Sequence, residues 1–447
     1  MSYLDVVLLI TGIPFTILGL MVAHFMAFAL VGLFFKKKYP ETEKKYKYGL
    51  IIPARNEEAV VSKLIESIQK NNYPQDKLHI FVIAHNCTDK TAAIARKYDG
   101  VSVYEYNNPA ENTMGYAFRY LFSCIERDFG TQSFDGFFLF NADNILDKNY
   151  ITKMNDAFDY FGKECVITSY RNSKNFGSNL ISGLYGMYFT MGCRFESRGR
   201  TVMGCSTRVQ GTGYLINSEI VKDGWKYVTL AEDWEFTADQ VLRERNIRYC
   251  DEAVFYDEQP TSMRIMWRQR VRWSRGHLIV FYTRIKDLFS KIFLKKTKNR
   301  GSVYDIFVNV LPVPLLILLF YIIQGTLLAI APLCDKALTY KQIFIGNSTD
   351  ILLSKGVLFV WLRSMILYCA TMILGAITIF VVERKRIKNV SFIKKALISI
   401  LWPLFLSIQF IMDIQALFSK NLGWKPIPHN DQTSFEHVNQ KENAAAQ

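Results

Sequence analysis

The sequence lacks several features that would assign it to a common class. Its eight cysteines are scattered and include no C-x-x-C pair, so neither a zinc site nor a disulfide framework is predicted. A glycine-rich G-x-G-x-x-G or Walker A loop is also missing, which excludes the dinucleotide and P-loop folds. Charged residues make up only 21% of the chain against 50% hydrophobic residues. That balance excludes a disordered or fibrous protein.

The charge balance of the chain is basic. Lysine and arginine outnumber the acidic residues 54 to 40, for a formal net charge of +14. Such an excess can indicate a nucleic-acid partner, but the apolar residues gather in runs of membrane-spanning length. Basic membrane proteins carry their excess charge on the cytoplasmic face, and the arginine-rich segment here has no interleaved base-stacking strands. We therefore expect a membrane protein with a large soluble part and no nucleic-acid partner.

Three apolar runs are predicted to cross the membrane. The first, Val6–Phe35, follows no lysine or arginine and precedes three lysines at 36–38. The positive-inside rule then places the N-terminus outside and the following residues in the cytoplasm, whereas a cleaved signal peptide has the opposite charge order. The other two runs, Ile306–Leu333 and Gly356–Val382, form a hairpin. We assign 1–40 to an N-terminal transmembrane helix and 301–383 to a transmembrane hairpin.

A fourth apolar run, Ala396–Phe418, is of a different kind. Positive charge lies on both sides of it, and Pro403 and Asp413 interrupt it. We expect an interfacial or re-entrant segment within 384–429, with an ordinary crossing as the alternative. The polar residues 430–447 are expected to be disordered.

The soluble part of the chain, 45–262, reads as one α/β domain. Apolar runs of strand length alternate with segments of helical periodicity, which predicts a parallel sheet. Ligands bind beyond the carboxyl ends of the strands in such sheets. The predicted strands are Tyr48–Pro53, Leu78–Ala84, Val101–Tyr106 and Gly136–Phe140.

Polar motifs follow three of these strands. Ala54–Glu58 follows the first strand, His85–Asp89 the second, and Asn141–Asn144 the fourth. Because parallel strands end at one edge of a sheet, these motifs should converge. Asp143 is placed to hold a hard cation through oxygen ligands, although an aspartate there could also cap the next helix.

Two later clusters carry further chemistry. The adjacent carboxylates Glu232 and Asp233 could supply a general base, although such pairs are common on surfaces. Downstream, Trp273 could pack against a sugar ring. Four arginines would share one face of a helix and suit a diphosphate, the alternative being a basic helix on anionic lipid. These arginines are Arg264, Arg268, Arg272 and Arg275.

Taken together, the motifs carry a family resemblance. PARNEE at 53–58, NCTD at 86–89, Asp143, Gly211-Thr212-Gly213, Glu232-Asp233 and QxxRW at 269–273 occur in this order. The set resembles the membrane-embedded, processive family-2 glycosyltransferases, which are the cellulose, hyaluronan, chitin and mixed-linkage β-glucan synthases. The resemblance covers about residues 45–425. The segment 424–429 is similar to their cytoplasmic gating loop, through Trp424, Lys425 and His429.

The resemblance implies a GT-A (Rossmann-like) α/β fold in the cytoplasm, with interfacial helices at 263–300 that carry QxxRW. It also implies a nucleoside-diphosphate sugar donor and Mg²⁺ or Mn²⁺ as cofactor. Three positions depart from the family pattern: His85 and Asn141 replace aspartates, and Met114 replaces a lysine. The implied roles are donor-nucleotide binding by Arg55, Glu57, His85, Asp89, Asn141 and Arg272; metal binding by Asp143; catalysis by Asp233 with Glu232; and acceptor binding by Gln269, Trp273, Gly211 and Thr212.

The expected function is an inverting, processive synthase of the plasma membrane. It would polymerise UDP-glucose into a β-glucan, such as cellulose or mixed-linkage 1,3;1,4-β-glucan, and export the polymer between the spans. Its partners would be the UDP-sugar, the growing polysaccharide and the lipid bilayer, with a homo-oligomer or accessory export proteins as further options. The alternatives are a hyaluronan- or chitin-like synthase using UDP-N-acetylglucosamine, a non-processive glycolipid glycosyltransferase, and a catalytically inactive scaffold.

Overall fold

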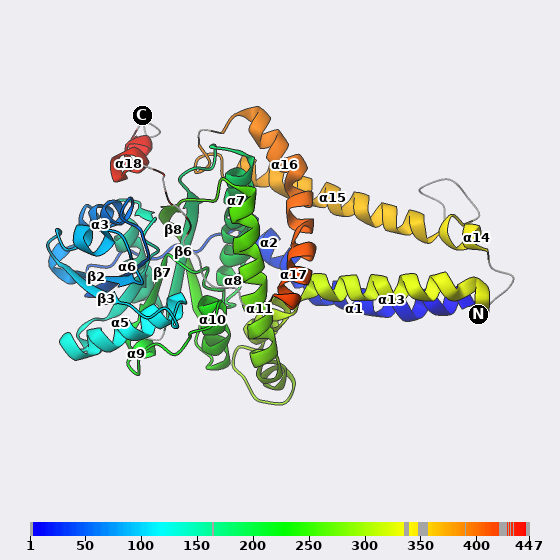
Figure 1. The fold of residues 1–447 in the computed structure, drawn as a ribbon, viewed down its shortest axis with the longest axis horizontal. Coiled ribbons are helices and arrows are strands. Elements are labelled where there is room, and N and C mark those ends of the chain that lie inside the picture. Colours follow the sequence, from blue (N-terminus) through cyan, green and yellow to red (C-terminus); the bar gives the residue numbers. More distant parts are fainter. Residues whose placement is uncertain are drawn as a thin grey trace.

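A computed structural model of the chain describes residues 3–162, 165–334, 339–346, 356–388, 390–419 and 433–443, together with 427, 429 and 431. An α/β domain forms one end of the molecule, and long helices extend from it in one direction (Figure 1). The chain enters through helices α1 (Tyr3–Val22) and α2 (His24–Phe34) before it reaches the first strand.

The described strands form one mixed sheet in the order β3-β2-β1-β4-β7-β6-β8-β5. The four predicted strands are confirmed to within one residue at each end, and they pair in parallel as expected. The prediction of a wholly parallel sheet is wrong for the other half, where β7 runs antiparallel to β4 and β6, and β5 antiparallel to β8. The strands are β1 Tyr48–Ala54, β2 Leu78–His85, β3 Val101–Tyr106, β4 Gly136–Leu139, β5 Ile145–Leu146, β6 Val166–Ser173, β7 Tyr214–Asn217 and β8 Ile247–Asp257.

Helices cover both faces of this sheet. Alternate residues of β1 point to opposite faces, as the period of a strand requires: Leu50 and Ile52 pack with one helix layer, and Ile51 packs with the other. These side chains are fully buried, and each contributes about 1.5–3 kcal/mol relative to an exposed one. The first layer is α3 Val61–Gln69 and α6 Tyr150–Phe161; the second is α5 Met114–Asp128 with α10 Glu232–Leu242.

The N-terminal apolar run is divided between two environments. The helix α1 packs along α13, whereas α2 packs against a short π-helix, η3 (Gly192–Ser197), and α8 (Arg198–Val202). A Cβ added at Gly199 would lie 2.0 Å from the carbonyl oxygen of Phe28, so only glycine permits this close approach. His24 of α2 also lies 3.0 Å from the buried Asp305. The N-terminal helix is thus fixed to the α/β domain.

The next apolar run starts later than its sequence predicts. We expected a span from Ile306, but Ile306 and Val310 belong to α12 (Arg300–Val310) and are buried against α10 and α11 (Met263–Phe293). Pro312 lacks a backbone N–H and holds the preceding residue in an extended conformation, which ends α12. The long apolar helix is therefore α13, Val313–Cys334.

Among the described residues, four helical segments are long and apolar enough to cross a membrane: Asp5–Phe34, Val313–Cys334, Val357–Val382 (α15) and Phe392–Phe418. The last is broken into α16 (Phe392–Ser407) and α17 (Gln409–Phe418). In Figure 1 α17 runs across the end of α13, whereas α16 packs against the C-terminal part of α15, and Tyr368 of α15 donates to the carbonyl oxygen of Pro403. The remaining short helices are α4 Thr91–Ala95, α7 Leu180–Met191, α9 Ser218–Val221 and α14 Tyr340–Phe344.

The expectation of a disordered C-terminal tail is wrong for Phe435–Asn443, which forms helix α18. The side chain of Asn439 accepts a hydrogen bond from the backbone N–H of Lys148, and Lys70, directly after α3, pairs with Glu436. These polar contacts attach the segment to the α/β domain. Two residues of the expected gating loop, Trp424 and Lys425, lie outside the described residues.

Candidate active site

The loops after β1 and β2 are joined by side chain to backbone hydrogen bonds. Asn56 and Asn86 both adopt a left-handed conformation, which asparagine tolerates better than most residues. The side chain of Asn56 accepts from the backbone N–H of Thr88 at 2.8 Å, and Asp89 accepts from that of Glu58 at 3.1 Å. The convergence of these motifs is thereby confirmed.

A cavity of about 130 Å³ lies beyond these loops. It is lined by Arg55, Glu57, His85, Asn141, Asp143, Gln269 and Arg272 among others. Burial lowers the pKa of His85, so its ring is neutral near pH 7. One ring nitrogen lies 2.7 Å from the carbonyl oxygen of Glu111, which identifies that nitrogen as the donor.

Asp143 is the carboxylate best placed for a metal ion. It is 4% exposed and lines the small cavity. Its Oδ1 accepts a hydrogen bond from Asn144, and its Oδ2 accepts one from the backbone of Glu258 at 2.9 Å, leaving a further lone pair on each oxygen. Among the described residues, no three His, Cys, Asp or Glu side chains come together as a complete metal site. The residues nevertheless fit Mg²⁺ or Mn²⁺ held with a diphosphate, because such ions need only one or two protein carboxylates.

Two of the residues expected to bind ligands make structural contacts. The carboxylate of Asp89 accepts hydrogen bonds from Glu58 and Thr91 and holds the two loops together. Thr212 is buried, accepts from the backbone of Asn141 at 2.8 Å and donates to Asn144. Neither residue lines the two cavities. Their contacts support the loops, and their roles in ligand binding stay predictions.

His429 reaches the small cavity from the C-terminal segment. Its Nδ1 lies 2.8 Å from a carboxylate oxygen of Glu57. Burial alone would lower the pKa of His429, but the negative charges of Asp143 and Glu57 raise it to about 9. Burial raises the pKa of Glu57, and the hydrogen bond to His429 opposes that rise. A positive charge is therefore present beside Asp143 at neutral pH.

A second cavity, of about 540 Å³, adjoins the first. Glu232 and Asp233, at the start of α10, line it together with Gly211. Burial is the main cause that raises the pKa of both carboxyl groups, for Glu232 to about 8. The backbone N–H of Trp234 and the charge of Arg272 oppose the rise for Asp233. Asp233 therefore holds the charge of the pair.

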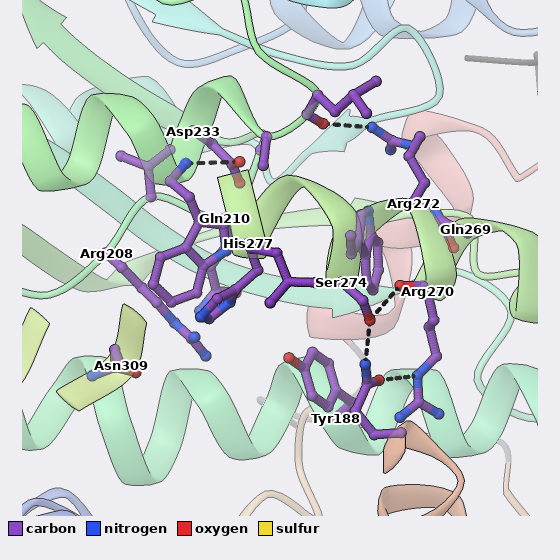
Figure 2. Close-up of a pocket in the computed structure, with 18 of the residues that line it drawn as sticks. Tyr188, Arg208, Gln210, Asp233, Gln269, Arg270, Arg272, Ser274, His277 and Asn309 are labelled. Atoms are coloured by element: carbon purple, nitrogen blue, oxygen red, sulfur yellow. Dashed lines mark hydrogen bonds between the residues drawn. The ribbon is translucent and has the colours of Figure 1, made fainter. Parts of the chain in front are cut away.

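Helix α11 carries Gln269 and Arg272 into the site (Figure 2), and its Trp273 also lines the large cavity. Arg272 donates to the carbonyl oxygen of Leu230, just before α10, which fixes it beside the carboxylate pair. The predicted row of four diphosphate-binding arginines is wrong, because only Arg272 of the four lines a cavity. Arg270, which is not one of the four, also lines the large cavity; it is buried and donates to Gln409 and to the carbonyl oxygen of Phe405.

The two cavities share five lining residues: Met114, Asn141, Arg171, Gln269 and Arg272. We call these five residues the throat. Sequence reasoning missed Arg171, which lies within β6, and Asp257, which ends β8 and pairs with it. Asp257 stands at the end of a strand, and Asp143 stands shortly after one. This position was the signal in the sequence that could have identified Asp257 as a site residue. No comparable signal distinguished Arg171, because a charged residue within a strand usually faces solvent.

The fold and the site together define the class of protein to which this chain belongs. The architecture is the GT-A α/β fold followed by several long apolar helices. Along 94% of this chain and 100% of the other, it matches the solved structure of a mannosyltransferase from Pyrobaculum calidifontis in complex with GDP-Man and Mn²⁺. The TM-score is 0.57 at 12% sequence identity, so this likeness concerns the fold alone.

Residues 46–276, more than half of the chain, match the family described as glycosyltransferase like family 2, and the chain belongs to that family. A probable glycosyltransferase YdaM of Bacillus subtilis is 26% identical over 60% of this chain and 63% of its own length. A beta-monoglucosyldiacylglycerol synthase of Nostoc sp. is 23% identical over 57% and 53%. A poly-beta-1,6-N-acetyl-D-glucosamine synthase of Staphylococcus aureus is 22% identical over 55% and 57%. The chain thus matches between about half and two thirds of these relatives.

Proposed function

We propose that this protein is an inverting hexosyltransferase that uses a nucleoside-diphosphate sugar. The observation that carries the proposal is the junction of two cavities at one throat, with Asp143 on the small side and Asp233 on the large side. A donor in the small cavity and an acceptor in the large one would meet there. Transfer from the opposite face of the sugar inverts its anomeric carbon.

The small cavity suits the nucleotide and the diphosphate. Among the residues that line it, Arg55 offers hydrogen-bond donors and the second ring nitrogen of His85 an acceptor, and Arg272 can hold a diphosphate through its fork of N–H groups. A divalent ion on Asp143 would neutralise charge on the departing diphosphate. Burial around Asp143 and Arg272 excludes water, which strengthens these interactions.

Asp233 would act as the general base. Its raised pKa makes its carboxylate a stronger base than an ordinary aspartate, while the backbone N–H of Trp234 and the charge of Arg272 favour its ionised form. Glu232, with a pKa of about 8, stays protonated and adds no second charge. An acceptor hydroxyl in the large cavity would lose its proton to Asp233 as it attacks.

The large cavity suits the end of a polysaccharide. Trp273, Trp234, Tyr188 and Phe189 line it, and aromatic faces pack against the C–H faces of sugars. Its volume is about four times that of the small cavity, at about 540 against 130 Å³. We therefore propose a processive synthase that makes a β-glucan from UDP-glucose.

A glycolipid synthase is the second candidate. The large cavity is also lined by apolar residues of α1, α2 and α13, among them Val22, Phe25 and Val313. A lipid acceptor could enter from the bilayer along these residues. One curated relative is a beta-monoglucosyldiacylglycerol synthase.

The length of the product separates the two candidates. Purified full-length protein would be incubated with radiolabelled UDP-glucose, Mg²⁺ and lipid extract, and the products would be digested with linkage-specific glucanases. The first proposal expects long chains that a β-glucanase degrades. Single-sugar lipid adducts would support the glycolipid synthase and contradict the polymerase. Incorporation from UDP-N-acetylglucosamine but not UDP-glucose would overturn the choice of sugar.

We further propose a plasma-membrane location with the α/β domain in the cytoplasm. The apolar segment 392–418 is broken between α16 and α17, and α17 runs across the end of α13 (Figure 1); this supports an interfacial position for 392–418 rather than a crossing. Reporter fusions after residue 345 and after residue 419 would test the topology. The first site is expected outside the cell and the second inside.

A further inference from the structure

The position of the throat determines which part of the donor its five residues can contact. The diphosphate lies on the Asp143 side and the acceptor on the Asp233 side, as proposed above. The transferred hexose must therefore lie between them, against the five throat residues. Of these, Arg171 is the one cation that the resemblance leaves without a role.

Arg171 is held rigidly at this position. Its guanidinium carbon lies 3.4 Å from the centre of the Phe189 ring, and its Nε donates to Asp257 at 2.7 Å. Its Nη1 donates to the carbonyl oxygen of Gln210 at 3.1 Å. The side chain is only 12% exposed. A planar group fixed on an aromatic face loses little entropy when it binds a ligand.

The hydrogen-bonding capacity of Arg171 is not exhausted by these contacts. A guanidinium has five N–H groups, and the described partners use Nε, one N–H of Nη1 and one N–H of Nη2. Hexose hydroxyls are the acceptors that a sugar presents at this place. Phe189 also meets Trp273 edge to face at 6.2 Å, so Arg171 and the proposed acceptor platform rest on the same ring.

The charge of Arg171 is already neutralised. Asp257 is 2% exposed and pairs with it, and the Asp233 carboxylate lines the large cavity on the other side of the throat. A sugar carboxylate would therefore meet no unpaired cation from Arg171 and would approach the negative charge of Asp233. A neutral sugar meets no such penalty.

We propose that Arg171 reads a hydroxyl of the transferred sugar and that, together with Asp257, it restricts the donor to neutral hexoses. This inference rests on the proposed function and narrows its substrate class. It excludes the uronic acid donors that an alternating polymer such as hyaluronan needs. Arg171 contacts the substrate in this proposal and takes no part in proton transfer.

Deoxy donors provide the test. The full-length protein would first be assayed with UDP-glucose, UDP-N-acetylglucosamine and GDP-mannose, and the fastest donor would then be replaced by analogues that each lack one hydroxyl. Incorporation of the first sugar would be measured, because an analogue can terminate a chain. A hydrogen bond to a charged group contributes about 1.5–3 kcal/mol, so we expect the wild type to reject one analogue by roughly 10–150-fold in kcat/KM. In Arg171→Gln that penalty should fall below about threefold, with the other penalties unchanged.

A matched control distinguishes recognition from stability. Arg194 forms a similarly buried pair with Glu383, at 2.7 Å and with 14% exposure, but it lines neither cavity. Arg194→Gln is expected to lower the melting temperature about as much as Arg171→Gln and to keep every deoxy penalty. If Arg171→Gln fails to fold, Arg171→Lys replaces it with the same expectation of a reduced penalty.

Asp257→Asn tests the charge argument by removing the negative partner of Arg171. It leaves Arg171 with an unpaired positive charge, so we expect the use of UDP-glucuronate relative to the neutral donor to rise at least about tenfold. The inference would be overturned, and the proposed function would stand, if the deoxy donors lost the same kcat/KM in the wild type and in the Arg171 variants. Ready use of UDP-glucuronate by the wild type would have the same consequence. A wild type that transfers from none of the neutral donors would instead overturn the proposed function.

Discussion

The two cavities differ in how the chain builds them. Short sequence motifs at the ends of β1, β2 and β4 line part of the small cavity, and the end of β8, α5, α11 and His429 also contribute to it. The large cavity is lined by residues of α2, α10, α11, α13 and α17, among other elements, which lie up to about 390 residues apart. Local motifs therefore account for more of the proposed donor side than of the proposed acceptor side, which depends on how the apolar helices pack against the α/β domain.

The largest expected effect comes from Asp233→Asn. Asparagine keeps the shape of the side chain but cannot take a proton, so transfer should fall by ~10²–10⁴-fold while UDP binding stays within about twofold. Turnover of radiolabelled donor and UDP calorimetry measure the two quantities. If Asp233→Asn lowered turnover and UDP affinity equally, the two cavities would not be separate in function.

Asp143→Ala should affect the other cavity. Removal of the carboxylate is expected to abolish the increase in UDP affinity that Mn²⁺ produces, because no second cluster of ligands is present among the described residues. Calorimetry with and without Mn²⁺ measures this. Mn²⁺ stimulation that persists in the variant would place the metal elsewhere.

Trp273→Phe tests the acceptor platform. A smaller ring would shift the acceptor hydroxyl, and a displacement of about 1 Å can cost ~10²-fold in rate. We expect loss of most product with normal UDP affinity and normal membrane insertion. A near-normal yield from equal amounts of folded protein would make Trp273 only an anchor at the interface, since its ring also packs against Tyr185.

His429→Gln should have a smaller effect on the donor side. A protonated His429 adds positive charge beside Asp143, and we expect its loss to weaken UDP binding by about tenfold. Because the pKa of His429 is raised to about 9, its charge is fully present at pH 6.5 and is lost as the pH rises through about 9. Wild-type UDP affinity should fall over that range, and the variant should show a flatter profile. The same slope in both proteins would assign the effect to another group.

Asp89→Ala should have the smallest effect on chemistry. The carboxylate accepts hydrogen bonds from the loops and the start of α4, and loss of such a cap costs about 0.5–2 kcal/mol. We expect a lower melting temperature with UDP affinity reduced less than threefold at 15 °C. A large loss of affinity in a fully folded variant would return Asp89 to the ligand site.

Several elements could be predicted because their causes are local. The strands β1 to β4 follow from short apolar runs, and the positions of Asp143, Asp233 and Trp273 follow from motifs. The antiparallel half of the sheet could not be predicted, because the partner of β7 depends on long-range packing. Arg171 could not be predicted for the same reason. Its position in the site depends on its contacts with Phe189 and Asp257 and not on the residues next to it in the sequence. Helix α18 was missed because its composition is polar and its contacts are tertiary.

The close contact of Gly199 with Phe28 has a consequence for the working cycle. Helix α2 continues from α1, which is proposed to lie in the bilayer, and the contact leaves no space for the two surfaces to slide. The α/β domain is therefore held at a constant height above the membrane surface. If the enzyme adds many sugars to one chain, the catalytic groups stay where they are, and the saccharide itself must advance by one residue after each transfer.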